Sequence, residues 1–185
     1  RNGEMSMPSV LYEKDGRIAR ITLNRPEVMN AINEELAIEP EKSVKEADAD
    51  PEIHVTVLSC AGSAFCVGCD LGKFAQTEGA NKYIKEMPWD PMTDYVFMWE
   101  SAQCFISLWR SMKPFLCKIN RYAVAVRSDI ALCADMTIMA EDAQIGYMPV
   151  CVLGSPTTAM WVYRLGAEKA KRVLFTGDKI SGHEA

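Results

Sequence analysis

The chain has 185 residues, of which 49% are hydrophobic and 24% are charged, and its net charge is −5 at pH 7. These are ordinary globular values, which exclude a collagen, a coiled coil and bulk disorder. The length fits one domain, and the mildly acidic balance argues against nucleic-acid binding. No run approaches the length of uninterrupted apolar sequence that a transmembrane helix needs, so we expect no membrane span.

The seven cysteines are odd in number, which favours reduced thiols over a disulfide framework. Residues 66–69 form a C-x-x-C pattern, but the chain has no second such pair and only two histidines. We therefore expect no metal site. The N-terminus lacks the charged region and apolar run of a secretory signal, so we expect a cytoplasmic protein.

In chain order, the first predicted element is a β-hairpin. Residues 10–13 and 17–23 form its strands, and residues 14–16 form a turn that ends on glycine. Helical spacing follows over residues 33–47, with three residues predicted to point inward: Leu36, Val44 and Ala47. Because an interior proline costs about 3 kcal/mol, we expect a kink or a split at Pro40.

Residues 53–59 form a short β-branched run that is typical of a buried parallel strand. A loop of small residues over 60–72 and a polar excursion over 75–91 come next. Residues 93–113 then predict a helix that Pro114 ends. Its apolar face comprises Met98, Ala102, Phe105, Trp109 and Met112.

Residues 115–126 predict one further strand, and residues 136–140 another. Between them, Ser128 is expected to cap a helix that has Asp129 in its first turn. After a loop over 146–156, two helices are expected over residues 157–165 and 167–175, separated by Gly166. Strands that alternate with helices predict an α/β fold with a largely parallel sheet.

Four segments of the chain together resemble the crotonase (enoyl-CoA hydratase/isomerase) superfamily, in the same order and at compatible spacing. They are residues 24–31, 64–71, 122–135 and 175–181. The resemblance implies a spiral of ββα units around a largely parallel sheet. It covers residues 10–185, which we expect to form one core domain after a tail over residues 1–9. It also leads us to expect that the family's C-terminal helical segment is absent from this chain.

Members of this family bind acyl-CoA thioesters, and two backbone N–H groups stabilise the enolate oxygen. The resemblance assigns these oxyanion donors to Cys69 and Val126. Amides at a helix N-terminus suit a developing negative charge, and a loop of small residues lets a ligand approach the backbone. Coenzyme A would enter as part of the substrate, with no separate cofactor. The resemblance also implies a homo-oligomer, either a trimer or a hexamer.

The chain departs from the family at a run of glycines near the second donor. Arg121, Ala125, Val126 and Arg127 stand where the family pattern has glycine. Glycine serves where φ is positive or where the backbone approaches another group closely. Two interpretations stay open: the turn relaxes and Arg127 reaches solvent or a CoA phosphate, or a strained donor at Val126 impairs catalysis.

The acid/base positions depart as well. The family's hydratases use two glutamates; Asp129 stands at the first position and is the candidate catalytic residue, with a purely helix-stabilising role as the alternative. Residues 146–151 hold no carboxylate, and offer only the phenol of Tyr147 and the thiol of Cys151. Chemistry with one carboxylate, such as a proton shift or a hydrolysis, is therefore easier to support than hydration.

The remaining candidates would contact the substrate or its CoA moiety: Asn30, Ala31, Gly68, Asp70 and Tyr147. For Asp70 the alternative is a cap on the helix expected at Leu71, and for residues 30–31 it is a helix entry. We carry three hypotheses: an active enoyl-CoA hydratase or isomerase, a catalytically silent acyl-CoA binder, and a hydrolase on the same fold. The apolar helices expected over 93–113 and 157–175 favour self-association.

Overall fold

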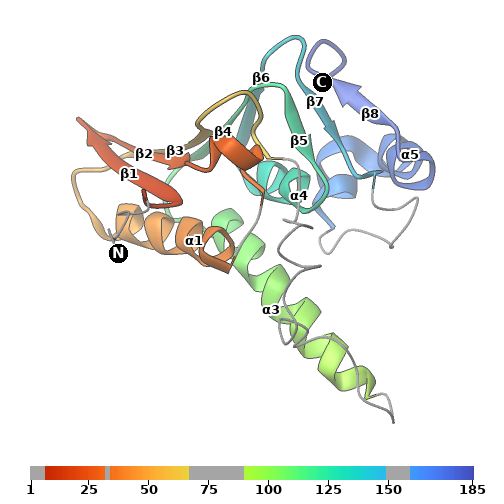
Figure 1. Cartoon of the computed structure of the whole chain (residues 1–185), viewed down its shortest axis with the longest axis horizontal. Coiled ribbons are helices and arrows are strands. Elements are labelled where there is room, and N and C mark those ends of the chain that lie inside the picture. Colours follow the sequence, from red (N-terminus) through yellow and green to blue (C-terminus); the bar gives the residue numbers. More distant parts are fainter. Residues whose placement is uncertain (1–6, 32–33, 67–89, 149–158) are drawn as a thin grey trace, which may run out of the picture.

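The computed structural model describes residues 7–31, 34–66, 90–148 and 159–185. These residues form a five-stranded and a three-stranded sheet with helices packed against them (Figure 1). The α/β class and the crotonase-like arrangement around a largely parallel sheet are confirmed. No helix among the described residues is long and apolar enough to cross a membrane.

The larger sheet has the strand order β1-β2-β3-β4-β6. Its strands are β1 (Val10–Asp15), β2 (Ile18–Leu23), β3 (Val55–Cys60), β4 (Phe115–Ile119) and β6 (Met136–Met139). β1 and β2 form the predicted antiparallel hairpin, and the other neighbouring pairs are parallel. The parallel strands therefore end at one common edge of the sheet, beside the loops that follow Cys60 and Ile119.

The smaller sheet has the order β5-β7-β8, with β5 (Tyr122–Val124) parallel to β7 (Gln144–Gly146) and β7 antiparallel to β8 (Lys179–Ser181). The single strand predicted over residues 115–126 is therefore wrong. The chain leaves the first sheet after Ile119, turns at Arg121 with a φ of 58°, and enters the second sheet at Tyr122. No glycine or proline marks this turn in the sequence.

The helices are η1 (Pro26–Val28), α1 (Glu34–Ala49), α3 (Pro91–Trp109), α4 (Val126–Cys133) and α5 (Met160–Thr176). In Figure 1, α1 lies along the first sheet, and α3 passes below it and extends away from the rest of the molecule. Gly166 interrupts α5 with a φ of 74° and a ψ of 161°, so the predicted division of this segment at Gly166 is confirmed.

We expected a kink or a split at Pro40; it lies inside α1, which runs as one helix from Glu34 to Ala49, so the helix is not split there. Leu36, Val44 and Ala47 are 0–3% exposed, as predicted for the inward face. Burying such side chains contributes about 1–3 kcal/mol each, which together exceeds the cost of about 3 kcal/mol for the proline. Tertiary packing therefore overrides the local preference.

The helix α3 ends at Trp109, with Arg110 as its C-cap, four residues before the predicted end. The expected inward face is correct at Phe105, which is 7% exposed, and wrong at Trp109 and Met112, which are 45% and 87% exposed. Asp48 explains the early end. Its carboxylate accepts hydrogen bonds from the Ser111 hydroxyl and the Met112 backbone N–H, which hold this segment against the end of α1.

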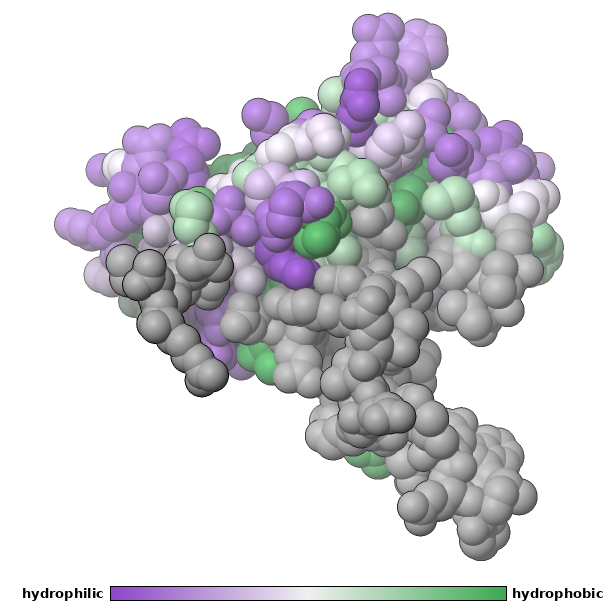
Figure 2. Space-filling view, in the orientation of Figure 1, coloured by the Kyte–Doolittle hydropathy of each residue, from purple (hydrophilic) through white to green (hydrophobic). Residues whose placement is uncertain are grey.

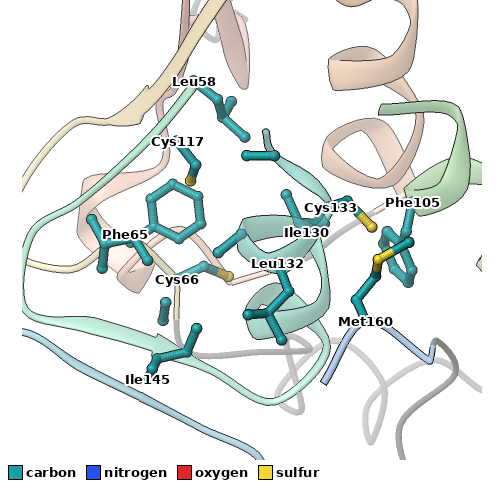
Figure 3. Close-up of a cluster of buried hydrophobic side chains, with 14 of the residues drawn as sticks. Leu58, Phe65, Cys66, Phe105, Cys117, Ile130, Leu132, Cys133, Ile145 and Met160 are labelled. Carbon is teal, nitrogen blue, oxygen red and sulfur yellow. The ribbon is translucent and has the colours of Figure 1, made fainter. Parts of the chain in front are cut away.

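One hydrophobic core joins the sheets and the helices. Figure 3 shows part of it, with Phe65, Cys66 and Cys117 among residues of α4 and with Phe105 near Met160. On the outside, hydrophilic residues cover the hairpin end and the opposite end of the described surface in the view of Figure 2, with smaller hydrophobic areas between them. The core fixes the loops at the carboxyl edge of the parallel strands.

Candidate active site

The candidate site is built at the carboxyl edge of β3 and β4. Residues 61–66 follow β3 there. Residues 120–125, which include β5, connect β4 to α4. Loops at the carboxyl ends of parallel strands are where α/β proteins most often bind ligands. Both loops belong to the segments that carry the predicted oxyanion donors.

A parallel bridge holds the two loops in register. The backbone N–H of Cys66 donates to the Tyr122 carbonyl oxygen at 2.9 Å, and the N–H of Val124 donates to the Cys66 carbonyl oxygen at 3.2 Å. Cys66 is thereby the partner of Ala123. Counting three residues onward from each partner reaches Cys69 on one loop and Val126 on the other.

Val126 is the first residue of α4. Its N–H is one of the first-turn amides that have no acceptor within their own helix, and these amides carry the partial positive charge of the helix N-terminus. Cys69 lies outside the described residues, as do two of the predicted substrate contacts, Gly68 and Asp70. The meeting of the two predicted donors on one oxygen stays a prediction.

The turn before α4 is made by Ala125, whose φ of 58° and ψ of −141° lie in a region that glycine occupies readily and other residues rarely. The Ala125 N–H donates to the Gly146 carbonyl at 3.1 Å, and the Ala125 carbonyl accepts from the Ser128 N–H at 3.0 Å. The strain expected at Val126 therefore lies one residue earlier, because Val126 itself is helical.

The expected N-cap at Ser128 is wrong. Ala125 is the N-cap of α4, with no side-chain cap, and Ser128 lies within the first turn, where its hydroxyl donates to the Ala125 carbonyl. The helix begins earlier than predicted because the positive φ of Ala125 turns the chain directly out of β5. Asp129 remains in the first turn, as predicted.

Asp129 is 0% exposed, and its carboxylate lies on the inner side of α4. Cys133 follows one helical turn later and is also fully buried. Burial and then the nearby Asp129 carboxylate raise the pKa of the Cys133 thiol to about 12, which keeps the thiol neutral. A carboxylate in the first turn of a helix and next to an apolar core can serve either of the predicted roles, helix stabilisation or proton transfer.

The second acid/base region contains β7 and Tyr147. Tyr147 is 5% exposed and belongs to the hydrophobic core, next to Ile145. Residues 144–148 contain no carboxylate. Cys151, the other group named from the sequence, lies outside the described residues. Asp129 is therefore the carboxylate that the described part of this site supplies.

Asn30 and Ala31, predicted to contact CoA, are buried at the end of the turn that contains η1. The Asn30 side-chain amide donates to the carbonyls of Ala61 and Ala64 at 2.9 and 2.8 Å, and its oxygen accepts from the Arg25 N–H at 2.7 Å. These bonds give Asn30 a structural role that the sequence did not indicate. A role of either residue in binding CoA stays a prediction.

Asn120 is a residue that sequence reasoning missed. Its side-chain oxygen accepts from the Cys60 thiol at 2.6 Å, its amide donates to the Gly62 carbonyl at 2.9 Å, and its backbone carbonyl accepts from the Phe65 N–H at 3.2 Å. Burial raises the pKa of Cys60 to about 11, so the thiol stays protonated as a donor. The available signal was a polar residue directly after a buried strand.

The thiols behave as expected for small buried groups. Cys60, Cys66, Cys117 and Cys133 are free thiols. Within the described ranges, no group of three or more histidine, cysteine, aspartate or glutamate side chains is placed to hold a metal ion.

The comparisons with known proteins agree with the crotonase-like α/β fold that the sequence led us to expect. The family model for enoyl-CoA hydratase/isomerase matches residues 13–185. The chain belongs to the enoyl-CoA hydratase/isomerase family.

Three similar proteins illustrate the relationship. The crystal structure of an enoyl-CoA hydratase from Mycobacterium smegmatis superposes with a TM-score of 0.87 at 43% identity, over 97% of this chain and 63% of that chain. An (E)-benzylidenesuccinyl-CoA hydratase from Thauera aromatica is 32% identical over 95% of this chain and 65% of that protein. A 2,3-dehydroadipyl-CoA hydratase from Escherichia coli (strain K12) is 26% identical over 97% of this chain and 66% of that protein. The chain thus spans just under two thirds of the length of these relatives.

Proposed function

We propose that the chain binds an acyl-CoA thioester and stabilises its enolate with the backbone amides of Cys69 and Val126. The parallel bridge between Cys66 and Ala123 carries this proposal, because both predicted donors stand three residues beyond it. The bridge places the two segments side by side, and from it one segment continues along the chain toward Cys69 and the other enters α4 at Val126. The relatives described above, which are hydratases of CoA esters, support the same class of substrate.

In this mechanism the thioester carbonyl oxygen accepts hydrogen bonds from the two amides. Negative charge grows on that oxygen as a C–H proton leaves the acyl chain, and preorganised donors stabilise the charge without reorganisation. The N-terminus of α4 adds its positive end at Val126. Asp129, in the same first turn, takes the proton and returns it to the acyl chain.

A proton shift along the acyl chain fits these residues better than addition of water. Hydration needs one group to activate water and another to deliver a proton to the α-carbon, and residues 144–148 supply no second carboxylate. A missing acid/base partner typically costs about 10²–10⁴ in rate. We therefore expect hydration of crotonyl-CoA far below the rate of an ordinary family member.

Two alternatives remain within the same fold. A catalytically silent acyl-CoA binder is favoured by the strained turn at Ala125, and a hydrolase is favoured by the single carboxylate Asp129. Exchange of the substrate's α- and γ-protons with deuterated water, followed by NMR on an enoyl-CoA, separates these possibilities. Exchange supports the proton shift, saturable binding without exchange supports the silent binder, and release of free CoA supports the hydrolase. No binding of any acyl-CoA would refute the proposal.

We also propose that the chain assembles as a homo-oligomer. α3 exposes apolar side chains at helical spacing, at Met92, Tyr95, Val96 and Trp99, each 46–61% exposed. An apolar stripe on a projecting helix favours association in water. Light scattering should give the mass of a multimer, and a clean monomer at high concentration would contradict this part.

A further inference from the structure

The backbone of residues 61–66 forms hydrogen bonds with two asparagines, the buried Asn30 and the half-buried Asn120. The Asn30 side-chain amide donates to the carbonyls of Ala61 and Ala64. The Asn120 side-chain amide donates to the carbonyl between them, that of Gly62, and the Asn120 carbonyl accepts from the Phe65 N–H. We call Asn30 and Asn120 the asparagine clamp.

Both asparagines are themselves fixed. Asn30 is 0% exposed and has a φ of 54°, a left-handed conformation that asparagine tolerates better than most residues. The Arg25 N–H donates to its side-chain oxygen at 2.7 Å. The Cys60 thiol donates to the side-chain oxygen of Asn120 at 2.6 Å, at the end of β3. Each amide is therefore oriented with its donors toward the loop.

The loop has little freedom to move in other directions. Its first N–H, at Ala61, donates to the Leu23 carbonyl at 2.8 Å. Gly62 has a φ of 80°, and a Cβ there would stand 2.7 Å from the Cβ of Pro26. The clamp thus holds a segment that already packs against η1, and the segment ends at the bridge between Cys66 and Ala123.

We infer that Asn30 and Asn120 are positioning residues: through residues 61–66 they fix the register of the segment that supplies the Cys69 amide against the one that supplies Val126. This inference rests on the proposed function, because it concerns the same oxyanion donors. It assigns Asn30 a role different from the CoA contact expected from the sequence. It also gives Asn120, which the sequence did not single out, a part in the reaction.

The geometric reason is that backbone donors must be aimed accurately at one oxygen. A displacement of about 1 Å at a reacting centre can cost about 10²-fold in rate. The residues of the clamp touch neither substrate nor reacting atoms in this account. Their loss should therefore lower kcat while KM changes little, because the binding of the CoA moiety is left intact.

The test compares Asn120→Ala with Asn24→Ala in the full chain. Asn24 is a matched control: it is also half-buried, and its side-chain amide donates to a backbone carbonyl at 3.1 Å, but that carbonyl belongs to Pro8 and not to residues 61–66. Asn120→Asp is the second variant, since it removes the donor to Gly62 and keeps an acceptor for Cys60. Asn30→Ala is added if it folds, as judged by circular dichroism.

Two readouts are measured on each variant: hydrogen–deuterium exchange in peptides covering residues 61–70, and kcat and KM for the enoyl-CoA proton exchange described above. We expect faster exchange over residues 61–66 and a kcat lowered about 10- to 100-fold with KM within about twofold in the Asn120 variants. Asn24→Ala should leave both unchanged.

Each other result has a definite meaning. Unchanged hydrogen exchange in Asn120→Ala would overturn the clamp. Faster exchange with an unchanged kcat would overturn its positioning role while leaving the proposed function intact. A parent chain that neither exchanges substrate protons nor binds acetoacetyl-CoA more tightly than CoA would overturn the proposed function and the positioning role together, and hydrogen exchange would still show whether the clamp holds the loop.

Discussion

The two backbone segments that lead to the predicted oxyanion donors are built differently. The first, residues 61–66, places a glycine at its positive-φ position, Gly62, and is tied by side-chain amides of two asparagines. The second, residues 121–125, has no glycine, and places Arg121 and Ala125 at φ values of 58°. At the same edge of the sheet, the first segment is a loop held by side-chain hydrogen bonds. The second is a strained turn held by backbone hydrogen bonds.

This difference separates two ways of fixing a backbone donor. The first segment depends on Asn30 and Asn120, so its geometry can be lost by removing a side chain. The second depends on the short path from β5 into α4, where the Ala125 N–H donates to the Gly146 carbonyl. Strain of this kind costs on the order of 1–3 kcal/mol and persists only where the surroundings impose it.

The largest expected effect concerns Asp129. Residues 61–66 of the first segment carry no carboxylate, whereas the second segment leads directly into α4, which carries Asp129 in its first turn. Asp129→Asn should lower turnover of an enoyl-CoA by about 10²–10⁴-fold and leave CoA affinity nearly unchanged. The measurements are steady-state kinetics and calorimetric binding of CoA. Asp142→Asn, an exposed aspartate, is the control, and equal activity of Asp129→Asn and the parent would restrict Asp129 to stabilising the helix.

Gly62→Ala should destabilise the chain by about 2–4 kcal/mol, because it adds backbone strain and a clash with Pro26. Gly16→Ala is the matched control: Gly16 has a φ of 59°, and an added Cβ there meets nothing within 4 Å. The control should lose only about 1–2 kcal/mol of backbone strain. Chemical denaturation measures both, and equal losses would mean that the loop yields to the added methyl group.

Ala125→Gly should stabilise the chain by about 0.5–2 kcal/mol, since relief of the strained φ exceeds the entropy that glycine loses on folding. Ala102→Gly, at a half-buried position in the interior of α3, should instead destabilise by about 0.5–1 kcal/mol. The comparison is made by thermal and urea denaturation. A destabilised Ala125→Gly would show that this turn carries no strain, and the contrast between the two segments would disappear.

Arg121→Gly tests the other end of the same turn and should have a smaller effect, a gain of less than about 1 kcal/mol. Arg121 is exposed, so few contacts are lost with its side chain. The same denaturation measurement applies. A loss of more than 1 kcal/mol would reveal that its side chain, rather than its backbone angle, matters at this position.

The smallest effect is a pH dependence in the first segment. Burial raises the pKa of Cys60 to about 11, so its thiol is neutral at pH 7 and ionises only as the pH approaches 11. Alkylation of Cys60 by iodoacetamide, followed by peptide mass spectrometry, should be slow at neutral pH and rise toward pH 11. Rapid alkylation at pH 8 would show that burial does not raise the pKa of this thiol.

Much of the architecture could be predicted from the sequence, because hydrophobic period and glycine placement act locally. Such patterns predict the hairpin that turns at Gly16, the buried strand after His54 and the break at Gly166. The continuation of α1 through Pro40 could not be predicted, since packing of the helix outweighs the local cost of the proline. The division between β4 and β5 was hidden because the turn at Arg121 contains neither glycine nor proline.

The candidate site could likewise be predicted only in part from the sequence. Asp129 and the two donors were all assigned by resemblance, and the first-turn position of Asp129 also fits a role in stabilising the helix. Asn120 stands first in the family pattern over residues 120–127, but the sequence does not show its role, which depends on Gly62 and Phe65, more than fifty residues earlier. Interactions of this kind become visible only when the fold brings distant segments together.

The central claim is that two segments in parallel register present the Cys69 and Val126 amides to one oxygen. A crystal structure of the chain with acetoacetyl-CoA tests it most directly. The account predicts that the thioester oxygen lies about 3 Å from both backbone nitrogens, with the Asp129 carboxylate facing the acyl chain. A thioester oxygen bound elsewhere, or the two nitrogens facing opposite sides of the sheet, would contradict it.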